Sequence, residues 1–299
     1  MLAGFVVDKL ELLPDNSSQV ISRFVFLVSM PAFIFISLAN VELQEFFNWS
    51  YLAVLSGGMA AIFLSSTLIA KFVFNETLTT QSLHALTAMF SSTAYIGLPL
   101  ILILFGEIGL VPGIIGAVIT GAIFMPLTII LAEIDKGDFH RKAVFTSVFT
   151  SLRAVLRNPL LIATAAGLLT SAYGVSIAEP VAEFLKLLGD AFIPCALFAA
   201  GLFISRCTIA GEITEITWLV LVKLVLHPLI TWWLAFHVFE LDGILATIAV
   251  LQAALPCGVP VFVIAQQYNS FVSRSSAVIA VSTALSGITL PLLIVLLVR

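Results

Sequence analysis

The stretch Ala94–Leu102, AYIGLPLIL, lies inside a long apolar run and carries Gly97 and Pro99 two residues apart. A proline in a helix interior removes a backbone hydrogen bond and costs roughly 3 kcal/mol or more. Inside a membrane the freed backbone groups are harder to satisfy, because hydrocarbon offers them no water. A helix interrupted here therefore indicates a functional position, and the rest of the sequence shows of what kind.

The composition is that of a membrane protein. Of the 299 residues, 61% are hydrophobic and 10% are charged, and the mean hydropathy is +1.16. Soluble domains contain about 45–50% apolar residues. Uncharged runs recur along the chain, and most exceed the ~18 residues that suggest a spanning helix. We expect an all-α polytopic protein in contact with the lipid bilayer, without a nucleic-acid partner.

Basic residues gather in alternate loops, above all in the segment 134–156, which includes EIDKGDFHRK. Positively charged loops stay in the cytoplasm. This predicts a cytoplasmic loop 134–156 and both termini outside, in a multi-pass protein of the bacterial inner membrane. Aromatic residues near span ends, such as Trp49 and Tyr51, are typical of interfacial anchors.

The N-terminal stretch MLAGFVV is too short to cross ~30 Å of hydrocarbon. We therefore expect the first helix to be incomplete, with about ten residues upstream in a complete protein. A short re-entrant start is the alternative.

Proline-containing segments recur in the same order in the two halves of the chain. SMPAFIF resembles FIPCALF, GLPLIL resembles GVPVFV, and MPLTII resembles LPLLIV. The paired prolines are Pro31 and Pro194, Pro99 and Pro260, and Pro126 and Pro291, at offsets of 163, 161 and 165 residues. We predict two five-helix repeats, 1–133 and 157–299, joined by 134–156. Because five is odd, the second repeat is inverted, as in many secondary transporters.

Interrupted spans stand at corresponding positions in these halves: SSTAYIGLPL in the fourth span and QAALPCGVPVF in the ninth. Half-helix N-termini that meet at a midplane site suit an anion such as a carboxylate. Simple kinks, patched by Ser or Thr hydroxyls, are the alternative. The predicted substrate-binding residues are Ser92, Thr93, Tyr95, Gly97, Pro99, Gln252, Pro256, Gly258 and Pro260.

Lys223 is the one cation well inside an apolar run, in WLVLVKLVLHPLI. Intramembrane ionisable residues usually face the bundle interior, which predicts a role in charge balance or coupling. The alternative is a lysine that reaches the cytoplasmic surface. His227 follows one turn later on the same face and can relay a proton or make a structural hydrogen bond. Asp190, four residues before Pro194, is a candidate proton site or partner of Lys223.

The segments RNPLLIATAAGLL, IPCALFAAGLFIS, VKLVLHPLI, YIGLPLILILFG and LPCGVPVFVIAQQYN make the chain resemble the bacterial branch of the auxin efflux carrier family. The resemblance implies ten helices in two inverted five-helix repeats, a sodium/proton-antiporter-like and bile-acid-symporter-like fold. It also implies that broken helices 4 and 9 cross at their centres. Bacterial relatives are associated with malonate and malate. Ser92–Thr93–Ala94 stands where the family often has Asn-Thr-Gly.

These observations together predict a secondary active transporter for a small organic anion, a mono- or dicarboxylate, that works by alternating access. The alternatives are a sodium-coupled bile-acid-type carrier, and a non-transporting membrane protein if the first helix is absent. Proton or sodium coupling and a homodimer are left open. The sequence contains neither His-Glu-x-x-His nor Gly-x-Ser-x-Gly, and its three cysteines lack metal-ligand spacing, so no enzyme, cofactor or metal is expected.

Overall fold

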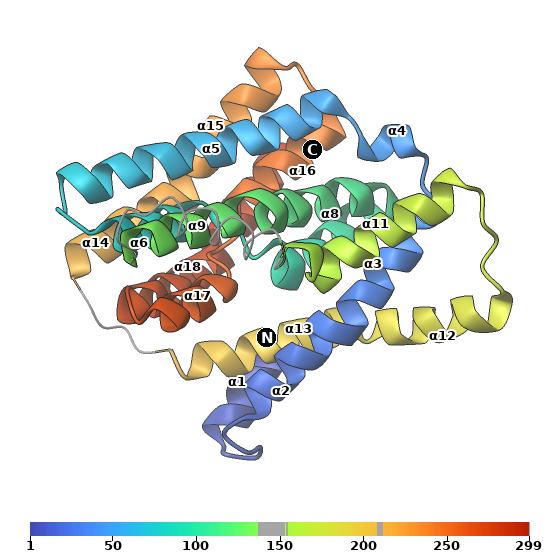
Figure 1. Ribbon diagram of the computed structural model, residues 1–299, viewed down its shortest axis with the longest axis horizontal. Helices are drawn as coiled ribbons and strands as arrows, with labels where there is room; N and C mark the ends of the chain where they lie inside the picture. Colours follow the sequence, from blue (N-terminus) through green and yellow to red (C-terminus); the bar gives the residue numbers. More distant parts are fainter. Residues whose placement is uncertain (137–152, 154, 208–211, 299) are drawn as a thin grey trace. The chain divides into compact units, whose positions relative to one another are not determined.

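The computed structural model of the chain is built from helices (Figure 1). It describes residues 1–136, 153, 155–207 and 212–298. Two compact units make up the chain, and each is described by itself. Unit 1 comprises Met1–Asn48, Ala94–Val118 and Leu156–Arg206, and unit 2 comprises Trp49–Thr93, Ile119–Val155 and Cys207–Arg299.

The part of the chain that the structure describes contains six helical stretches long and apolar enough to cross a membrane. These stretches are Ser17–Leu38, Leu43–Phe72, Thr93–Asp135, Glu179–Ser205, Ile213–Val238 and Val272–Leu297. Two shorter apolar helices, Pro159–Ala172 and Gly243–Ala254, accompany them. The prediction of an all-α polytopic membrane protein is confirmed. The expected cytoplasmic loop 134–156 lies for the most part outside the described residues.

The helices of unit 1 come from three separate segments of the chain and pack against one another. α3 packs against α11 and α12, and α1 packs against α13 (Figure 1). Glycine makes the second contact possible, because a Cβ at Gly201 would overlap the backbone of Met1. The helices of unit 1 are α1 (Leu2–Lys9), α2 (Ser17–Phe24), η1 (Val25–Ser29), α3 (Met30–Leu38), α4 (Leu43–Phe46), α7 (Leu98–Phe105), η3 (Gly106–Gly109), α8 (Leu110–Ile119, whose last residue belongs to unit 2), α11 (Pro159–Ala172), α12 (Glu179–Asp190) and α13 (Phe192–Ser205).

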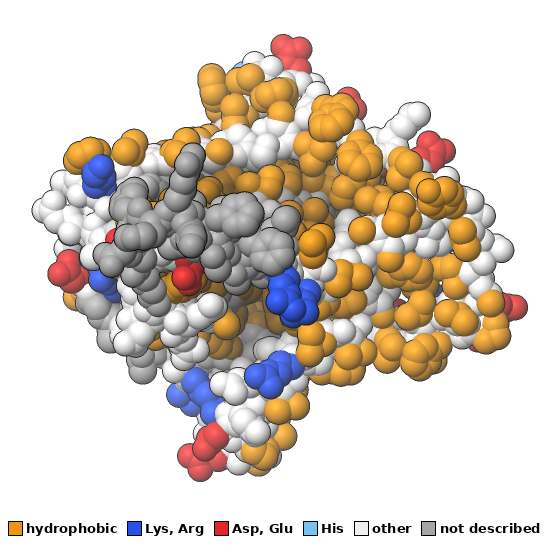
Figure 2. Space-filling model, in the orientation of Figure 1, with side chains coloured by type: hydrophobic (Ala, Val, Ile, Leu, Met, Phe, Trp, Pro, Cys, Tyr) orange, Lys and Arg blue, Asp and Glu red, His pale blue; other side chains and the backbone are white. Residues whose placement is uncertain are grey.

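Much of the surface of unit 1 is apolar. Figure 2 shows hydrophobic side chains over the region of α3, α11 and α12. Leu169, Tyr173, Phe184 and Leu187 are among the exposed members. Extended apolar surface of this kind marks contact with a membrane or a partner, and it accords with helices that face lipid.

Unit 2 is organised around two helices that are buried along most of their length. Every residue from Thr79 to Met89 in α6 is buried, and so is every residue from Ala246 to Ala254 in α16. α6 packs against α5, α9, α14, α17 and α18, and α16 packs against α5, α15 and α18. The helices of unit 2 are α5 (Trp49–Phe72), α6 (Leu78–Met89), η4 (Thr120–Phe124), α9 (Met125–Lys136), α14 (Ile213–Leu221), η5 (Val222–Leu226), α15 (His227–Trp233), η6 (Leu234–Val238), α16 (Gly243–Ala254), α17 (Pro260–Tyr268) and α18 (Val272–Leu297).

Four prolines inside the long helical stretches follow short π-helical segments. Pro31, Pro99, Pro126 and Pro228 each come two residues after the last residue of η1, η2 (Thr93–Gly97), η4 and η5, respectively. A proline has no N–H and its ring clashes with the carbonyl four residues earlier. The wider i→i+5 turn of a π-helix changes that pairing, and single π turns are recognised sites of helix bending. The prolines are thus accommodated without ending the helix.

Two helices are truly interrupted, and both interruptions lie beside the buried ends of α6 and α16. Residues 90–92 separate α6 from η2, and residues 255–259 separate α16 from α17. The second interruption contains Pro256 and Gly258, as expected. The first lies before Gly97 and Pro99, because η2 and α7 together carry the chain past Pro99 in helical form.

Candidate functional site

The two interrupted segments cross in unit 2 and pair through their backbones. Ser91 and Cys257 form an isolated antiparallel bridge. The N–H of Ser92 donates to the carbonyl of Pro256 at 2.9 Å, and the N–H of Cys257 donates to Ser282 Oγ at 3.1 Å. Backbone groups that the helix breaks leave open are thereby satisfied without water, as burial in a membrane requires.

Gly258 allows the two segments to approach this closely. A Cβ at this position would lie 2.5 Å from Cε1 of the Phe90 ring and 3.4 Å from the Cα of Ser92. Real Cβ atoms do not approach a ring carbon to 2.5 Å, so any larger residue has to displace Phe90. The glycine in QAALPCGVPVF therefore has a packing reason at the crossing itself.

Lys223 extends from η5 to the crossing and is fully buried. Its Nζ donates to Ser91 Oγ at 2.8 Å and to the carbonyl of Ala253 at 2.7 Å, and it lies 3.1 Å from His227 Nδ1. Three acceptors match the three donors of an ammonium group. We call Lys223, Ser91, His227 and the Ala253 carbonyl the Lys223 cluster. Its burial excludes the alternative in which the lysine reaches the surface.

The Lys223 cluster contains a cation without a carboxylate. Among the described residues, no acidic side chain forms an ion pair with Lys223. Helix dipoles do not supply the missing charge. α16 ends and α17 begins at the same interruption, so their half-charges of opposite sign nearly cancel. The crossing therefore carries the net positive charge of Lys223.

Gln252 and Tyr51 form the polar contact on another side of the crossing. Gln252 Nε2 donates to the Tyr51 hydroxyl at 2.9 Å, and both side chains are buried. The expectation that Tyr51 is an interfacial anchor is wrong, because α5 packs against α16 at this point and covers the ring.

The predicted site residues divide between the two units. Seven of them gather at or beside the crossing in unit 2: Ser92, Thr93, Gln252, Pro256, Gly258, Lys223 and His227. Pro260 also lies in unit 2, as the first residue of α17.

The remaining four predicted residues belong to unit 1. Tyr95, Gly97 and Pro99 follow directly on the crossing in sequence, and the Tyr95 hydroxyl hydrogen-bonds to Ser22. Asp190 is the exposed last residue of α12. Its predicted pairing with Lys223 stays a prediction.

Ser91 and Tyr51 contact predicted site residues but were not among the predicted positions. The sequence could have indicated Ser91, because it is the first hydroxyl residue of the SST run that precedes the Gly-Pro pair. Nothing in the sequence indicated Tyr51 as a site residue, since its position near the start of a span is equally typical of an interfacial anchor.

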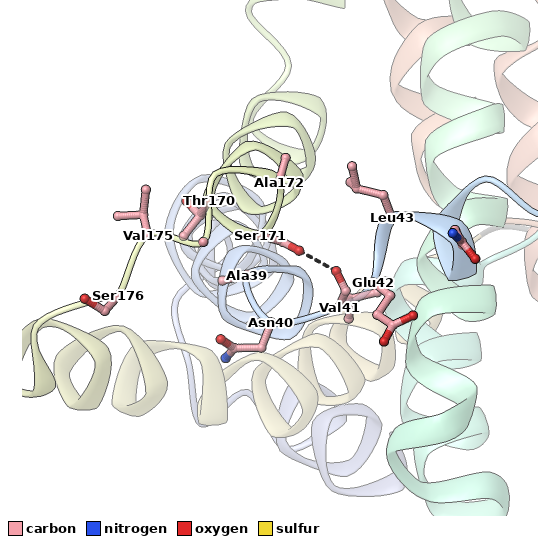
Figure 3. Close-up of a pocket in the computed structure, with 12 residues that line it drawn as sticks. Ala39, Asn40, Val41, Glu42, Leu43, Thr170, Ser171, Ala172, Val175 and Ser176 are labelled. Carbon is pink, nitrogen blue, oxygen red and sulfur yellow. Dashed lines mark hydrogen bonds between the residues drawn. The ribbon is translucent and has the colours of Figure 1, made fainter.

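Unit 1 contains a separate pocket of about 620 Å³ at the ends of α3 and α11. Figure 3 shows Asn40 and Glu42 on one side and Val175 and Ser176 on the other, with the Ser171 hydroxyl donating to the Val41 carbonyl. None of the predicted site residues lines it. It has one acidic side chain and no basic one, which gives it no feature suited to an anion.

Comparison with known proteins assigns the chain to a family. The model of a family described as "Membrane transport protein" matches residues 1–294. A protein of Rhizobium meliloti (strain 1021) named "Putative malonate transporter" is 25% identical over 286 residues, which are 96% of this chain and 89% of the relative.

Two further relatives extend this comparison. An "Uncharacterized transporter" of Methanothermobacter thermautotrophicus is 26% identical over 294 residues, which are 98% of this chain and 93% of the relative. "Auxin efflux carrier component 1" of Arabidopsis thaliana is 30% identical over 137 residues, covering 42% of this chain and 22% of the relative. The chain belongs to this family of membrane transport proteins, the auxin efflux carrier family.

Proposed function

We propose that this membrane transport protein is a secondary active transporter for a small organic anion, a mono- or dicarboxylate, bound at the crossing of its interrupted helices. The observation that carries the proposal is the buried Lys223, held by three neutral acceptors and by no carboxylate of the described residues. A buried charge is costly unless it is paired. A substrate carboxylate supplies the missing negative charge.

The surrounding groups suit such a ligand. Ser92, Thr93 and Gln252 add hydroxyl and amide groups that can donate to carboxylate oxygens. The relative named for malonate supports the choice of a dicarboxylate. Tyr95, Gly97, Pro99, Pro256, Gly258 and Pro260 complete the proposed substrate-binding set.

Alternating access of two inverted repeats is the proposed mechanism. Pro31 and Pro194, one matched pair of the predicted repeat, both lie in unit 1, and Pro126 and Pro291, another pair, both lie in unit 2. The third pair is divided, with Pro99 in unit 1 and Pro260 in unit 2, so two of the three pairs support repeats 1–133 and 157–299. The proposed location is the bacterial inner membrane, with both termini outside and 134–156 cytoplasmic, and a homodimer stays a prediction.

Exchange of labelled malonate tests the proposal. The full-length protein is reconstituted into liposomes loaded with unlabelled malonate, and entry of labelled malonate is followed. We expect exchange that unlabelled malonate inhibits and the uncharged analogue malonamide does not. Lys223→Met is expected to abolish it, whereas Lys71→Met, which removes an exposed lysine at the end of α5, is expected to retain it. The proposal would be contradicted if Lys223→Met exchanged malonate at the wild-type rate, or if the wild type exchanged none of the small acids tried.

A further inference from the structure

A second group of ionisable side chains lies in unit 2, apart from the Lys223 cluster. Nη1 of Arg274 is 2.5 Å from Glu76 Oε1 and 2.5 Å from Glu215 Oε2. His84 lies on the far side of Glu215, with 3.7 Å between Nε2 and Glu215 Oε1. We call Arg274, Glu76, Glu215 and His84 the Arg274 cluster.

The inner half of this cluster is buried and incompletely hydrogen-bonded. The side chains of His84 and Glu215 are 0% exposed. Glu215 Oε1 and both ring nitrogens of His84 make no hydrogen bond of normal geometry, although the backbone of Ser66 lies near the ring. Buried polar atoms in native proteins are nearly always paired, so three such atoms in two neighbouring side chains need an explanation.

The net charge of the Arg274 cluster offers an explanation for these unpaired atoms. Arg274 contributes one positive charge, and Glu76 and Glu215 contribute two negative charges. With His84 neutral, the cluster holds an excess of one negative charge, partly buried. One added proton removes the excess charge, and from His84 Nε2 it can be donated to Glu215 Oε1 once the 3.7 Å between the two atoms closes.

The other charged or titratable groups around α6 have partners of their own. On α9, Asp135 accepts from Thr79, and Glu133 accepts from Tyr268 of α17. On η5, Lys223 bonds to Ser91 and His227, while Tyr51 of α5 bonds to Gln252. Glu212, the N-cap residue of α14, also acts on Glu215 and adds negative charge. Beyond these, α5 ends with the exposed Lys71.

From this geometry we infer that the Arg274 cluster is a proton-binding site, in which one proton is shared between His84 Nε2 and Glu215 Oε1. The outer residues Arg274 and Glu76 are 24% and 21% exposed, whereas the inner pair is fully buried. No other group is consumed or released in this step.

The position of the site connects it to the crossing. His84 precedes Ser91 by seven residues on α6, and Glu215 precedes Lys223 by eight along α14 and η5, or roughly 10–12 Å of helix. Proton binding draws α6 and α14 together two turns from the Lys223 cluster. This part of the inference rests on the proposed function, since it makes the proton the coupling ion of the anion transporter.

Nuclear magnetic resonance of ¹⁵N-histidine tests proton binding without reference to transport. The chain has four histidines, so Nε2 and Nδ1 of His84 can be assigned by comparison with His84→Gln. Between about pH 8 and pH 5, where histidine ordinarily titrates, we expect the His84 ring to gain a proton in the wild type. Glu215→Gln keeps the ring but removes its negative partner, and we expect it to abolish the gain. A ring that stays neutral throughout, or that titrates alike in Glu215→Gln, overturns the site.

Transport assays then distinguish the coupling role of the Arg274 cluster from the carrier function of the protein. We expect His84→Gln to retain malonate exchange and to lose malonate accumulation driven by a pH gradient, while the exposed His237→Gln retains both. Equal pH-driven accumulation in His84→Gln and wild type overturns the coupling role alone. No exchange in the wild type overturns the proposed function, and the resonance experiment still decides the proton site.

Discussion

The Lys223 cluster and the Arg274 cluster both lie in unit 2 and differ in the sign of their excess charge. The first has one buried cation among neutral acceptors. The second has one cation between two carboxylates, with a buried histidine beside them. Because unpaired charge is costly away from water, we propose that each cluster is completed from outside, one by an anion and the other by a proton.

The largest expected effect comes from removing the cation of the Arg274 cluster. Arg274→Gln leaves Glu215 buried without its partner, and breaking such a pair lowers the free energy of unfolding by about 3 kcal/mol. Adding Glu215→Gln in the same chain removes the stranded charge and is expected to recover much of the loss. Unfolding of the purified full chain in detergent measures both. A double variant no more stable than Arg274→Gln would show that the two charges are independent.

The next largest effect is expected from a variant that gives the Lys223 cluster the carboxylate that it lacks. Ser91→Asp places a carboxylate next to Lys223 Nζ and so provides internally the charge that we assign to substrate. Malonate at 100 times its dissociation constant stabilises the wild type by about 2.7 kcal/mol, and we expect this gain to vanish in Ser91→Asp. Ser91→Ala, which adds no charge, is the control and should keep part of the gain. Thermal unfolding with and without malonate gives the answer, and an undiminished shift in Ser91→Asp would refute the charge argument.

A smaller effect is expected from the geometry that holds the crossing together. Gly258→Ala forces the Phe90 ring aside, and overpacking of this kind costs about 2 kcal/mol. Gly287→Ala in α18 is the matched control, since a Cβ there meets nothing within 4 Å. Alanine in a helix interior is favoured over glycine by up to about 1 kcal/mol, so the control should be neutral or stabilising. Equal destabilisation of the two variants would mean that the close approach at Gly258 is unimportant.

The smallest effect is expected where an ion pair is partly exposed. In unit 1, Nη2 of Arg206 lies 2.6 Å from Asp8 Oδ1; the Arg206 side chain is 38% exposed and the Asp8 side chain is 8% exposed. The hydrogen bond from Arg206, and a second from Ser205, lower the pKa of the Asp8 carboxyl. A lowered pKa means that the pair stabilises the fold above the ordinary aspartate pKa of about 4, and that this contribution is lost as the pH falls further.

Comparison of wild type with Asp8→Asn measures this contribution. We expect a shift in unfolding temperature close to the error of the measurement at neutral pH, no difference in acid, and a weaker effect in salt. A loss of stability in Asp8→Asn as large as that in Arg274→Gln would contradict the expectation that a buried ion pair contributes more to stability than a partly exposed one.

Much of the fold could be read from the sequence, because hydropathy and proline positions report directly on helices in a membrane. The interruption at Pro256–Pro260 and the buried position of Lys223 fall in this class. The interruption of the fourth span was harder to place, since the π-helix η2 runs directly into α7, which contains Pro99, and the break lies at residues 90–92. Proline marks where a hydrogen bond is missing, but not which turn compensates for it.

The site was less predictable because it depends on which helices are neighbours. α6 and α16 are buried by other helices, so polar residues such as Gln81 and His84 cost less there than they would facing lipid. With 12 residues each, both helices are too short to stand out as membrane spans, although they lead into the crossing. His84 and Glu215 are 131 positions apart, and no pattern in a single sequence indicates that they meet.

The backbone pairing at the crossing has a consequence for hydrogen exchange. Extended residues between helices usually exchange their amide protons quickly, because local opening there costs little. Here the amide of Ser92 is bound by Pro256, and that of Cys257 by Ser282, in buried surroundings. Release of the Ser92 proton requires the two breaks to separate, and release of the Cys257 proton requires the second break to move away from α18. The non-helical residues at the breaks should therefore be among the slowest to exchange in unit 2, and the frayed ends of its helices the fastest.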